Sequence, residues 1–415
     1  MAISIEITFL MFAFGICSDL LHEVRTYKDS AIMYLSLLFA FYRCQVDRRA
    51  LRITLVNCPW LLRLLCSLFT GMMFTISLQA QGASIPHHGP AGLIWEVPLE
   101  TEGSYTEEVS ALINAYEAET GARLVPGLRG KVGIKVNSRS GRGLSTPLGL
   151  LRSVIEAFEK RGFQRQAIFI VDHSMYELQE AGVLSPLSKS ALNFEGCPVY
   201  ALDRELYYDK DWFYDSPLPP SRDQNIRPAD ETSVEPALLS EGATDRKSFL
   251  PMPLLFDVDF WVNLAVGVDN PALGIDGALA NATLWNVSNS QRFLRSEATA
   301  SVAVAEIAAI PELNERMLLH FVSLERYQYI GGPKFNSLYT HSEPILWMSS
   351  DPVAIDRLLF ERINGLRRNN GFPEIDSIPR QLIFAARLGL GVFEETRIQV
   401  KSIPTSHGLQ GKEKY

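Results

Sequence analysis

Polar side chains follow three apolar runs that are typical of buried strands, namely Lys131–Asn137, Ala167–Val171 and Ile345–Met348. Asn137 ends the first run, and Asp172 and His173 follow the second. Asp351 comes shortly after the third. Ligands of open parallel sheets bind beyond the carboxyl ends of the strands. The pattern therefore predicts one polar pocket to which these distant segments contribute.

Carboxylate, imidazole and amide groups in one pocket suit a divalent metal ion or a small polar metabolite. We expect Asp172 to act as a ligand or proton acceptor and His173 as a general acid or base. Asp351 is expected to be a second ligand or proton acceptor. Asn137 and Asn281 are expected to orient the bound group.

Each of these residues also has a purely structural explanation. Asn137 could make a turn by bonding to its own backbone, and Asp172 could cap a helix expected at Ser174–Ala181. Asp351 precedes a proline and an apolar helical pattern, so that it could cap that helix. Lys135 is either a solvated strand residue or a fourth ligand-binding group. Only coordinates can separate these alternatives.

Composition excludes several classes of protein. The chain of 415 residues has a formal net charge of −8 and no long Lys/Arg-rich run, so we expect no nucleic-acid partner. Four of its five cysteines precede residue 70, and the only later one is Cys197. No Cys-x-x-Cys pair exists, and we therefore expect neither a cysteine-ligated zinc ion nor an iron–sulfur cluster.

The first 83 residues differ from the rest. Arg63 and the apolar run Leu64–Leu78 have the form of a secretory signal, and small residues follow at 80–83. We therefore expect a signal peptide at 61–83 and a protein exported to the periplasm or the extracellular space. Residues 1–60 are then an artefact of the gene model or a membrane-associated segment. In the alternative interpretation the N-terminus is retained and anchors the protein to a membrane.

The remaining chain predicts a single α/β domain. The run at 131–137, a helix at Leu148–Arg161 and the run at 167–171 form a strand–helix–strand unit, which is typical of parallel sheets. We expect a mixed, mainly parallel sheet with helices on both faces over 126–400. Residues 84–125 are expected to be a lead-in with one helix, 203–250 a loop insertion, and 401–415 a polar tail.

Several short motifs occur in an order that resembles the domain of unknown function 362 family of bacteria and archaea. They are KVN at Lys135–Asn137, TP at Thr146–Pro147, VDHS at Val171–Ser174, FDVDFWVNLAV at Phe256–Val266, GALAN at Gly277–Asn281, SSDPVAIDRLL at Ser349–Leu359 and AARLGLG at Ala385–Gly391. Relatives usually carry Lys-x-His where this chain has Gly267-Val268-Asp269, and Lys-Asn where it has Ala280-Asn281. The ferredoxin-like cysteines of some relatives are also missing. The resemblance implies no particular reaction.

Three functional interpretations follow. The first is an exported enzyme that binds a metal ion or a small metabolite in a polar pocket at the strand ends. The second is a non-catalytic binding or structural protein descended from such an enzyme, which the missing Lys-x-His motif favours. A third interpretation, sugar binding through Trp212 and its aromatic neighbours, is less favoured. The only partners expected are a small-molecule ligand and, if the N-terminus is retained, a membrane.

Overall fold

The structure is a computed structural model that describes residues 86–99, 105–187, 192–216 and 247–404. All of these belong to one compact unit, Ala83–Tyr415. The predicted signal peptide, residues 1–60 and most of the predicted polar tail lie outside the described residues. Within the described part of the chain, no helix is long and apolar enough to cross a membrane.

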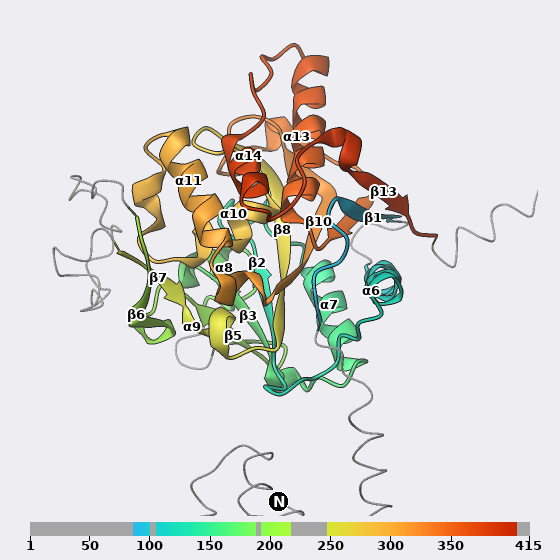
Figure 1. The fold of residues 1–415 in the computed structure, drawn as a ribbon, viewed down its shortest axis with the longest axis vertical. Helices are drawn as coiled ribbons and strands as arrows, with labels where there is room; N and C mark the ends of the chain where they lie inside the picture. Colours follow the sequence, from blue (N-terminus) through green and yellow to red (C-terminus); the bar gives the residue numbers. More distant parts are fainter. Residues whose placement is uncertain (1–85, 100–104, 188–191, 217–246, 405–415) are drawn as a thin grey trace, which may run out of the picture. The chain divides into compact units, whose positions relative to one another are not determined.

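A large mixed sheet forms the centre of the molecule, in the strand order β13-β1-β12-β10-β8-β2-β3-β5-β4 (Figure 1). Its middle strands β10, β8, β2, β3 and β5 are parallel, whereas β12 runs antiparallel to both of its neighbours. The predicted mixed, mainly parallel α/β sheet is confirmed. The strands are β1 (Leu93–Pro98), β2 (Val132–Val136), β3 (Ile168–Asp172), β4 (Asn193–Phe194), β5 (Cys197–Ala201), β8 (Phe260–Asn270), β10 (Met317–Gln328), β12 (Ile345–Ser349) and β13 (Gln399–Ser402). Two short strands, β9 (Gly274–Asp276) and β11 (Thr340–His341), pair with β8 and β10.

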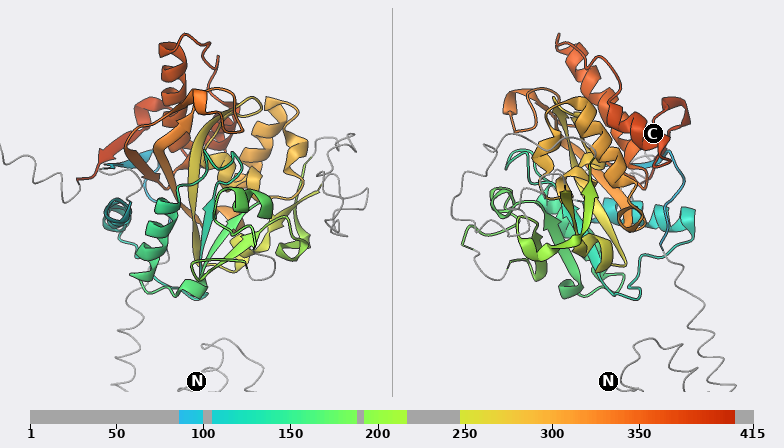
Figure 2. Two further views of the ribbon diagram at one scale, coloured as in Figure 1. Left: turned by 180° about the vertical axis from the view of Figure 1, so that it is seen from behind. Right: turned by 60° about the vertical axis from the view of Figure 1, so that its left-hand side comes forward.

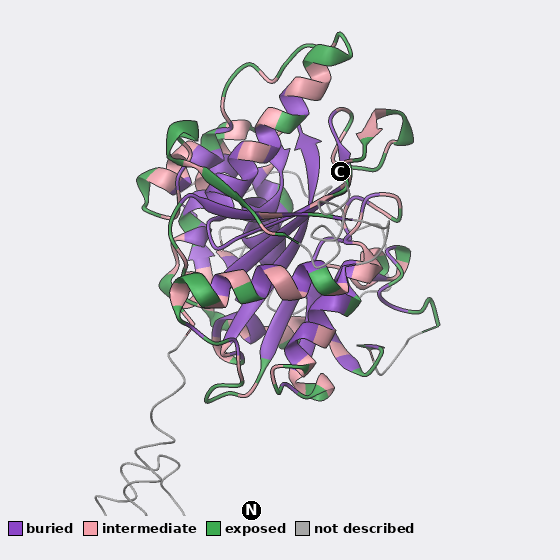
Figure 3. Ribbon diagram, turned by 90° about the vertical axis from the view of Figure 1, so that its right-hand side faces the viewer, coloured by how far each residue is buried: buried purple, intermediate pink, exposed green. Residues whose placement is uncertain are grey.

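Helices cover both faces of this sheet (Figure 1, Figure 2). One face packs against α10 (Ala278–Ala282), α11 (Glu297–Ala308), α13 (Pro352–Asn369) and α14 (Arg380–Arg387). The other face packs against α6 (Thr106–Thr120), α7 (Leu148–Glu159) and α8 (Met175–Glu180). Figure 3 shows the strands buried between helices whose outer surfaces are exposed. The apolar side chains of each helix explain this arrangement, because each buries its apolar face against the sheet.

The structure differs from the sequence prediction at three boundaries of the domain and its loop insertion. The predicted lead-in belongs to the domain, because β1 pairs with β12 and β13, and the buried face of α6 packs on the sheet. The domain also continues beyond residue 400, since β13 ends at Ser402. The aromatic half of the predicted loop insertion is the strand β6 (Tyr208–Asp215), which pairs with β7 (Lys247–Pro251). The rest of that insertion, 217–246, lies outside the described residues.

A row of buried polar side chains crosses the middle of the sheet. Lys135 on β2 pairs in register with Asn263 on β8, and Asn263 pairs with His320 on β10. His320 pairs in turn with Ser349 at the end of β12. Register partners on neighbouring strands face the same side. All four side chains therefore face the layer that contains α10 and α13, and none reaches solvent.

Candidate functional site

Lys135 is at the centre of the site, and its side chain is wholly buried. Its ammonium group donates to Asp172 Oδ1 at 2.7 Å, to Asn281 Oδ1 at 2.9 Å and to the backbone carbonyl of Val136 at 2.7 Å. Burial lowers the pKa of Lys135, and the Asp172 carboxylate opposes that shift. Three acceptors around three N–H bonds favour the charged form. The interpretation of Lys135 as a solvated strand residue is wrong.

Asp172 is bonded through both of its oxygens. Oδ1 accepts from Lys135 and from the backbone N–H of His173, at 2.7 Å each. Oδ2 accepts from the backbone N–H and the hydroxyl of Ser138, at 2.7 and 2.6 Å. Burial alone would raise the pKa of Asp172, but Lys135 and these hydrogen bonds hold it below its usual value. The carboxylate is therefore a buried anchor for the loop that begins at Ser138.

The polar row continues from Lys135 as a chain of side-chain hydrogen bonds. Asn281 Nδ2 donates to Asn263 Oδ1 at 2.7 Å, and Asn263 Nδ2 lies 3.0 Å from His320 Nδ1. An ammonium group can only donate, and it therefore fixes the orientation of the Asn281 amide and, through it, that of Asn263. Every link then points from Lys135 towards His320. Such one-directional chains are mutually reinforcing in a low-dielectric interior.

His320 ends this chain in a neutral form. Because its Nδ1 accepts from Asn263, its ring proton lies on Nε2, which is buried and has no partner among the described residues. Burial lowers the pKa of His320 to about 3, and His88 adds a small contribution in the same direction. An imidazole with such a pKa stays uncharged at neutral pH.

Beyond the carboxyl end of β2, the chain turns into a firmly held loop. Thr146 closes this loop, because its hydroxyl accepts from Asn137 N at 2.8 Å and donates to the Leu264 carbonyl at 2.7 Å. Ser138 ties the start of the loop to Asp172. Leu144 packs with two valines of β8. This loop, 138–146, is thus positioned by the sheet itself.

Three side chains at this end of the sheet make no hydrogen bond to another described residue. They are Asn137, Arg139 and His173. The Asn137 side chain is 3% exposed, and its Oδ1 is buried without a partner, as is Nε of Arg139. The Arg139 guanidinium lies over the Trp285 ring at 3.3 Å from its centroid. Unsatisfied buried polar atoms are uncommon and each needs an explanation.

His173 is half-buried next to charged neighbours. Burial lowers the pKa of its imidazole, whereas the carboxylates of Glu177 and Asp172 act in the opposite direction. Arg139 reinforces the lowering. The ring is therefore neutral at pH 7 and keeps one nitrogen available as an acceptor.

A segment that follows β10 covers the loop. Lys334 Nζ donates to the carbonyl of Arg139 at 2.6 Å and lies 3.3 Å from Glu177 Oε1. Phe335 N donates to the carbonyl of Ser140 at 2.8 Å. The Phe335 ring lies so close to Gly143 that a Cβ atom at that position would overlap it. We call Gly331–Tyr339 the cover segment; its contacts with the loop are largely exposed.

Asp351 does not share this site, and the prediction that it would is wrong. Because β12 is antiparallel, its carboxyl end points away from the carboxyl ends of β2 and β3. Asp351 and Asp172 are also separated by four steps across the sheet, which corresponds to roughly 19 Å at about 4.8 Å per step. Asp351 caps α13 through Ala354 N and also accepts from the backbone N–H groups of Gly92 and Val392, all at 2.8–2.9 Å.

Asp276 and Asp356 form a second buried acidic group beneath α10. Trp285 Nε1 donates to Asp276 at 2.8 Å, and burial raises the pKa of that carboxyl group despite nearby Arg139. Asp356 accepts from the backbone N–H groups of Ala278 and Leu279 at 2.6 and 2.9 Å. Burial raises the pKa of Asp356 to about 7, against those hydrogen bonds. Asp356 thus holds α10, which carries Asn281, against α13.

Among the described residues, no group of three or more His, Cys, Asp or Glu side chains could hold a metal ion. Both oxygens of Asp172 are already bonded. The sequence contains two Asn-x-Ser/Thr glycosylation sequons, at Asn281 and Asn286, and both asparagines are buried, which is unfavourable for attachment of a glycan. Trp212 packs against Phe256, with ring centroids 4.6 Å apart, so that its ring is partly covered.

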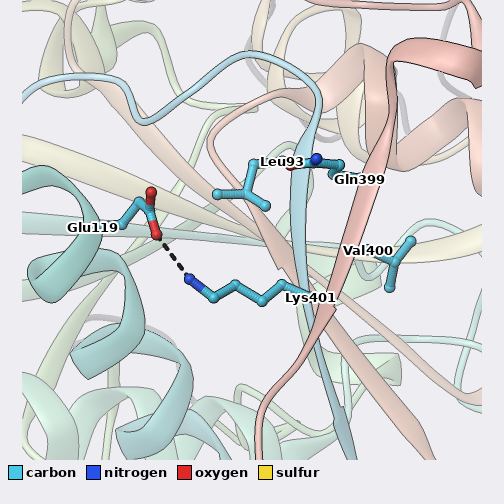
Figure 4. Close-up of a pocket in the computed structure, with 5 residues that line it drawn as sticks. All are labelled: Leu93, Glu119, Gln399, Val400 and Lys401. Carbon is cyan, nitrogen blue, oxygen red and sulfur yellow. Dashed lines mark hydrogen bonds and ion pairs between the residues drawn. The ribbon is translucent and has the colours of Figure 1, made fainter.

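A separate pocket of about 370 Å³ lies at the edge of the sheet, far along the strand order from β2 and β3. It is lined by Leu93, Glu119, Gln399, Val400 and Lys401. Figure 4 shows Lys401 pointing towards Glu119, and the two charged groups are 2.9 Å apart. Its other lining residues are Leu93 on β1 and Gln399 and Val400 on the exposed strand β13, so that the lining contains no unpaired charge that would select a ligand.

Of the predicted site residues, the structure brings together Lys135, Asp172 and Asn281 by direct contact, with Asn137 and His173 adjoining them in sequence. Sequence reasoning missed two members of the buried row. Asn263 and His320 are single polar residues inside apolar strands, FWVNLAV and MLLHFVSL, and that interruption was the available signal. It also missed Arg139, which looked like one of several loop arginines.

Comparisons with known proteins give no assignment. No protein-family model matches the chain, and the search of curated proteins finds no significant match.

Proposed function

We propose that this protein binds a small polar metabolite at the carboxyl ends of β2 and β3. The observation that carries the proposal is the side-chain amide of Asn137, which is buried at that edge with an unpartnered oxygen. An unpaired buried amide costs about 1–3 kcal/mol, and a bound ligand group would remove that cost. His173, half-buried and neutral, adjoins the same edge.

The ion pair beneath the site has a supporting role in this proposal. Asp172 bonds to the backbone of both Ser138 and His173, and thus positions the start of each polar segment. With its oxygens occupied, Asp172 is a positioning residue instead of the proton acceptor first expected. His173 is the group that could accept or donate a proton, because its ring makes no hydrogen bond to a described residue.

We also propose that the chain is a diverged member of the domain of unknown function 362 family. The support comes from three motifs that resemble that family and are distant in sequence. Lys135, Asp172 and Asn281 each belong to a different motif, and the three side chains contact one another directly. Export through a signal peptide at 61–83 belongs to the same proposal and rests on the sequence alone.

A thermal-shift screen against a library of polar metabolites and divalent ions tests the proposed function. We expect at least one metabolite to raise the melting temperature of the wild-type protein. The shift should be lost in Asn137→Ala and in His173→Ala, and retained in Arg142→Ala, which changes an exposed side chain of the same loop. Hits that survive both site substitutions would place binding elsewhere and contradict the proposal.

One observation favours the second interpretation, a non-catalytic structural protein. Lys135 and Asp172 are fully hydrogen-bonded to each other and to neighbouring groups, and a buried pair of this kind can serve to fix a single arrangement of the core. A screen in which no metabolite shifts the melting temperature would support this interpretation.

A further inference from the structure

We propose that the ligand is a small carboxylic acid that carries a hydroxyl or amino group near its carboxylate. Arg139 binds the carboxylate, and the Asn137 amide oxygen accepts a hydrogen bond from the neighbouring hydroxyl or amino group. The inference rests on the proposed function and names the class of ligand for the same site.

The position of Arg139 carries the first half of this inference. The stacking of its guanidinium on Trp285 fixes the plane of the group. Trp285 is held in turn by Asp276, which accepts its indole N–H. Nε of Arg139 is buried and has no acceptor among the described residues. A guanidinium fixed in this way matches a planar carboxylate, because its N–H bonds are already arranged before binding.

Local charges favour a single negative charge on the ligand. Two other cations near the loop are already paired: Lys135 with Asp172 at 2.7 Å, and Lys334 with Glu177 at 3.3 Å. Arg142 is exposed, and Arg326 donates to the Gly143 carbonyl at 3.2 Å. In the described part of the chain, no carboxylate lies within salt-bridge distance of Arg139. Arg139 acts on the Asp276 carboxyl group without a hydrogen bond to it, so that the N–H groups of its guanidinium are free to bind a carboxylate. A phosphate dianion would carry a second charge close to Asp172, Asp276 and Glu177, which is unfavourable.

The position of Asn137 carries the second half of the inference, namely the hydroxyl or amino group on the ligand. The buried atom of its amide is the oxygen, an acceptor, and it therefore needs a donor on the ligand. Asn137 and Arg139 are separated by one residue in the loop that Thr146 and Ser138 hold in place. A small molecule that carries its donor on the same carbon atom as its carboxylate offers both groups to this short segment. Hydroxy acids and amino acids have this arrangement.

Titration calorimetry with three matched probes tests the inference. Lactate has both groups, propionate lacks the hydroxyl, and lactamide lacks the charge. Glycine and inorganic phosphate extend the series to an amino acid and to a different anion. The proteins are the full-length wild type, Arg139→Lys, Asn137→Ala and the matched control Arg142→Lys.

We expect lactate or glycine to bind the wild type at least about tenfold more tightly than propionate or lactamide, since each of these analogues leaves one buried group unpaired. We expect the same preference over phosphate, because its second charge is unfavourable beside the nearby carboxylates. Arg139→Lys should weaken the preferred acid about tenfold, and Arg142→Lys should not change it. Equal affinity for lactate and lactamide, preference for phosphate, or no binding of either acid would overturn the inference. The proposed function would survive if the metabolite screen gave an uncharged ligand whose binding needs Asn137 but not Arg139.

Discussion

Lys135 and Asp172 form an ion pair with 2.7 Å between Nζ and Oδ1, and neither side chain reaches solvent. The pair joins β2 to the carboxyl end of β3. From it, one set of hydrogen bonds runs through the sheet to His320, and another fixes the backbone of the loop at Ser138. The pair thus links the interior of the sheet to the proposed binding edge.

Removing the cation of this pair should strongly destabilise the fold. Lys135→Met leaves a buried carboxylate without its partner, and we expect a loss of about 3–5 kcal/mol in the free energy of unfolding. The double substitution Lys135→Met/Asp172→Asn should recover part of that loss, because no isolated charge is left. Urea denaturation of the three proteins provides the measurement. A loss below about 1 kcal/mol in the single variant would show that the pair contributes little.

Asp356 should make the fold less stable as the pH rises. Its folded pKa of about 7 lies above the usual value of 3.8, so that the protonated carboxyl group is favoured in the folded state. This contribution is complete below about pH 4 and is lost as the pH rises towards 7, by at most about 1.4 kcal/mol per pH unit. Relative to the wild type, Asp356→Asn should therefore gain stability over that range in urea titrations. If the free energies of unfolding of the two proteins changed in parallel with pH, the raised pKa assigned to Asp356 would be contradicted.

His320, in contrast to Asp356, should make the fold more stable as the pH rises. Its folded pKa of about 3 lies below the usual value of 6.5, and the neutral ring is therefore favoured in the folded state. This stabilisation is complete above about pH 6.5 and is lost as the pH falls towards 3. His320→Asn keeps an acceptor for Asn263 but cannot titrate. Between pH 4 and 6.5 its stability relative to the wild type should fall as the pH rises; an increase would exclude a neutral buried His320.

Asp351 should matter for stability and leave ligand binding unchanged. Asp351→Ala removes the acceptor of three buried backbone N–H groups, including the N-cap of α13. We expect a loss of about 3 kcal/mol in the free energy of unfolding. At about 19 Å from Asp172, it should not affect the affinity for a ligand of the strand-end site. If Asp351→Ala kept the stability of the wild type and lost ligand binding, Asp351 would have to be part of the binding site.

The cover segment should control access to the loop. Gly143→Ala places a methyl group where the Phe335 ring lies, and we expect the cover segment to be displaced. Backbone amides of 138–146 should then exchange with deuterium roughly tenfold faster, as a local opening made easier by about 1.4 kcal/mol requires. Amides of α6, which packs on the face of the sheet opposite α10 and α13, serve as the internal control. Unchanged exchange in the loop would mean that the cover segment does not protect it.

The fold could be predicted from the sequence because its strands and helices carry strong periodic patterns. The apolar run before Asp172 and the amphipathic helix after Thr146 and Pro147 identify a parallel strand–helix–strand unit. Strand order and direction are not encoded in such local patterns. The direction of β12 depends on its neighbours β1 and β10, and an error in that one direction placed Asp351 in the wrong pocket.

Only part of the candidate site could be predicted from the sequence, because the rest depends on contacts between distant segments. Asn137, Asp172 and His173 could be predicted because each is a polar residue at the end of an apolar strand pattern. Lysine in a strand usually reaches solvent, so that the burial of Lys135 depends on acceptors supplied by distant segments. The role of Arg139 depends on Trp285, which is far away in sequence. Contacts of this kind appear only after the chain has folded.

The most direct test of the central claim is a crystal structure of the wild-type protein with the acid that binds most tightly in calorimetry. We predict electron density for the acid at the carboxyl ends of β2 and β3, with its carboxylate bonded to Arg139 and its donor bonded to Asn137. Density only in the edge pocket beside Lys401, or an unchanged and empty strand-end site at saturating ligand, would contradict the account.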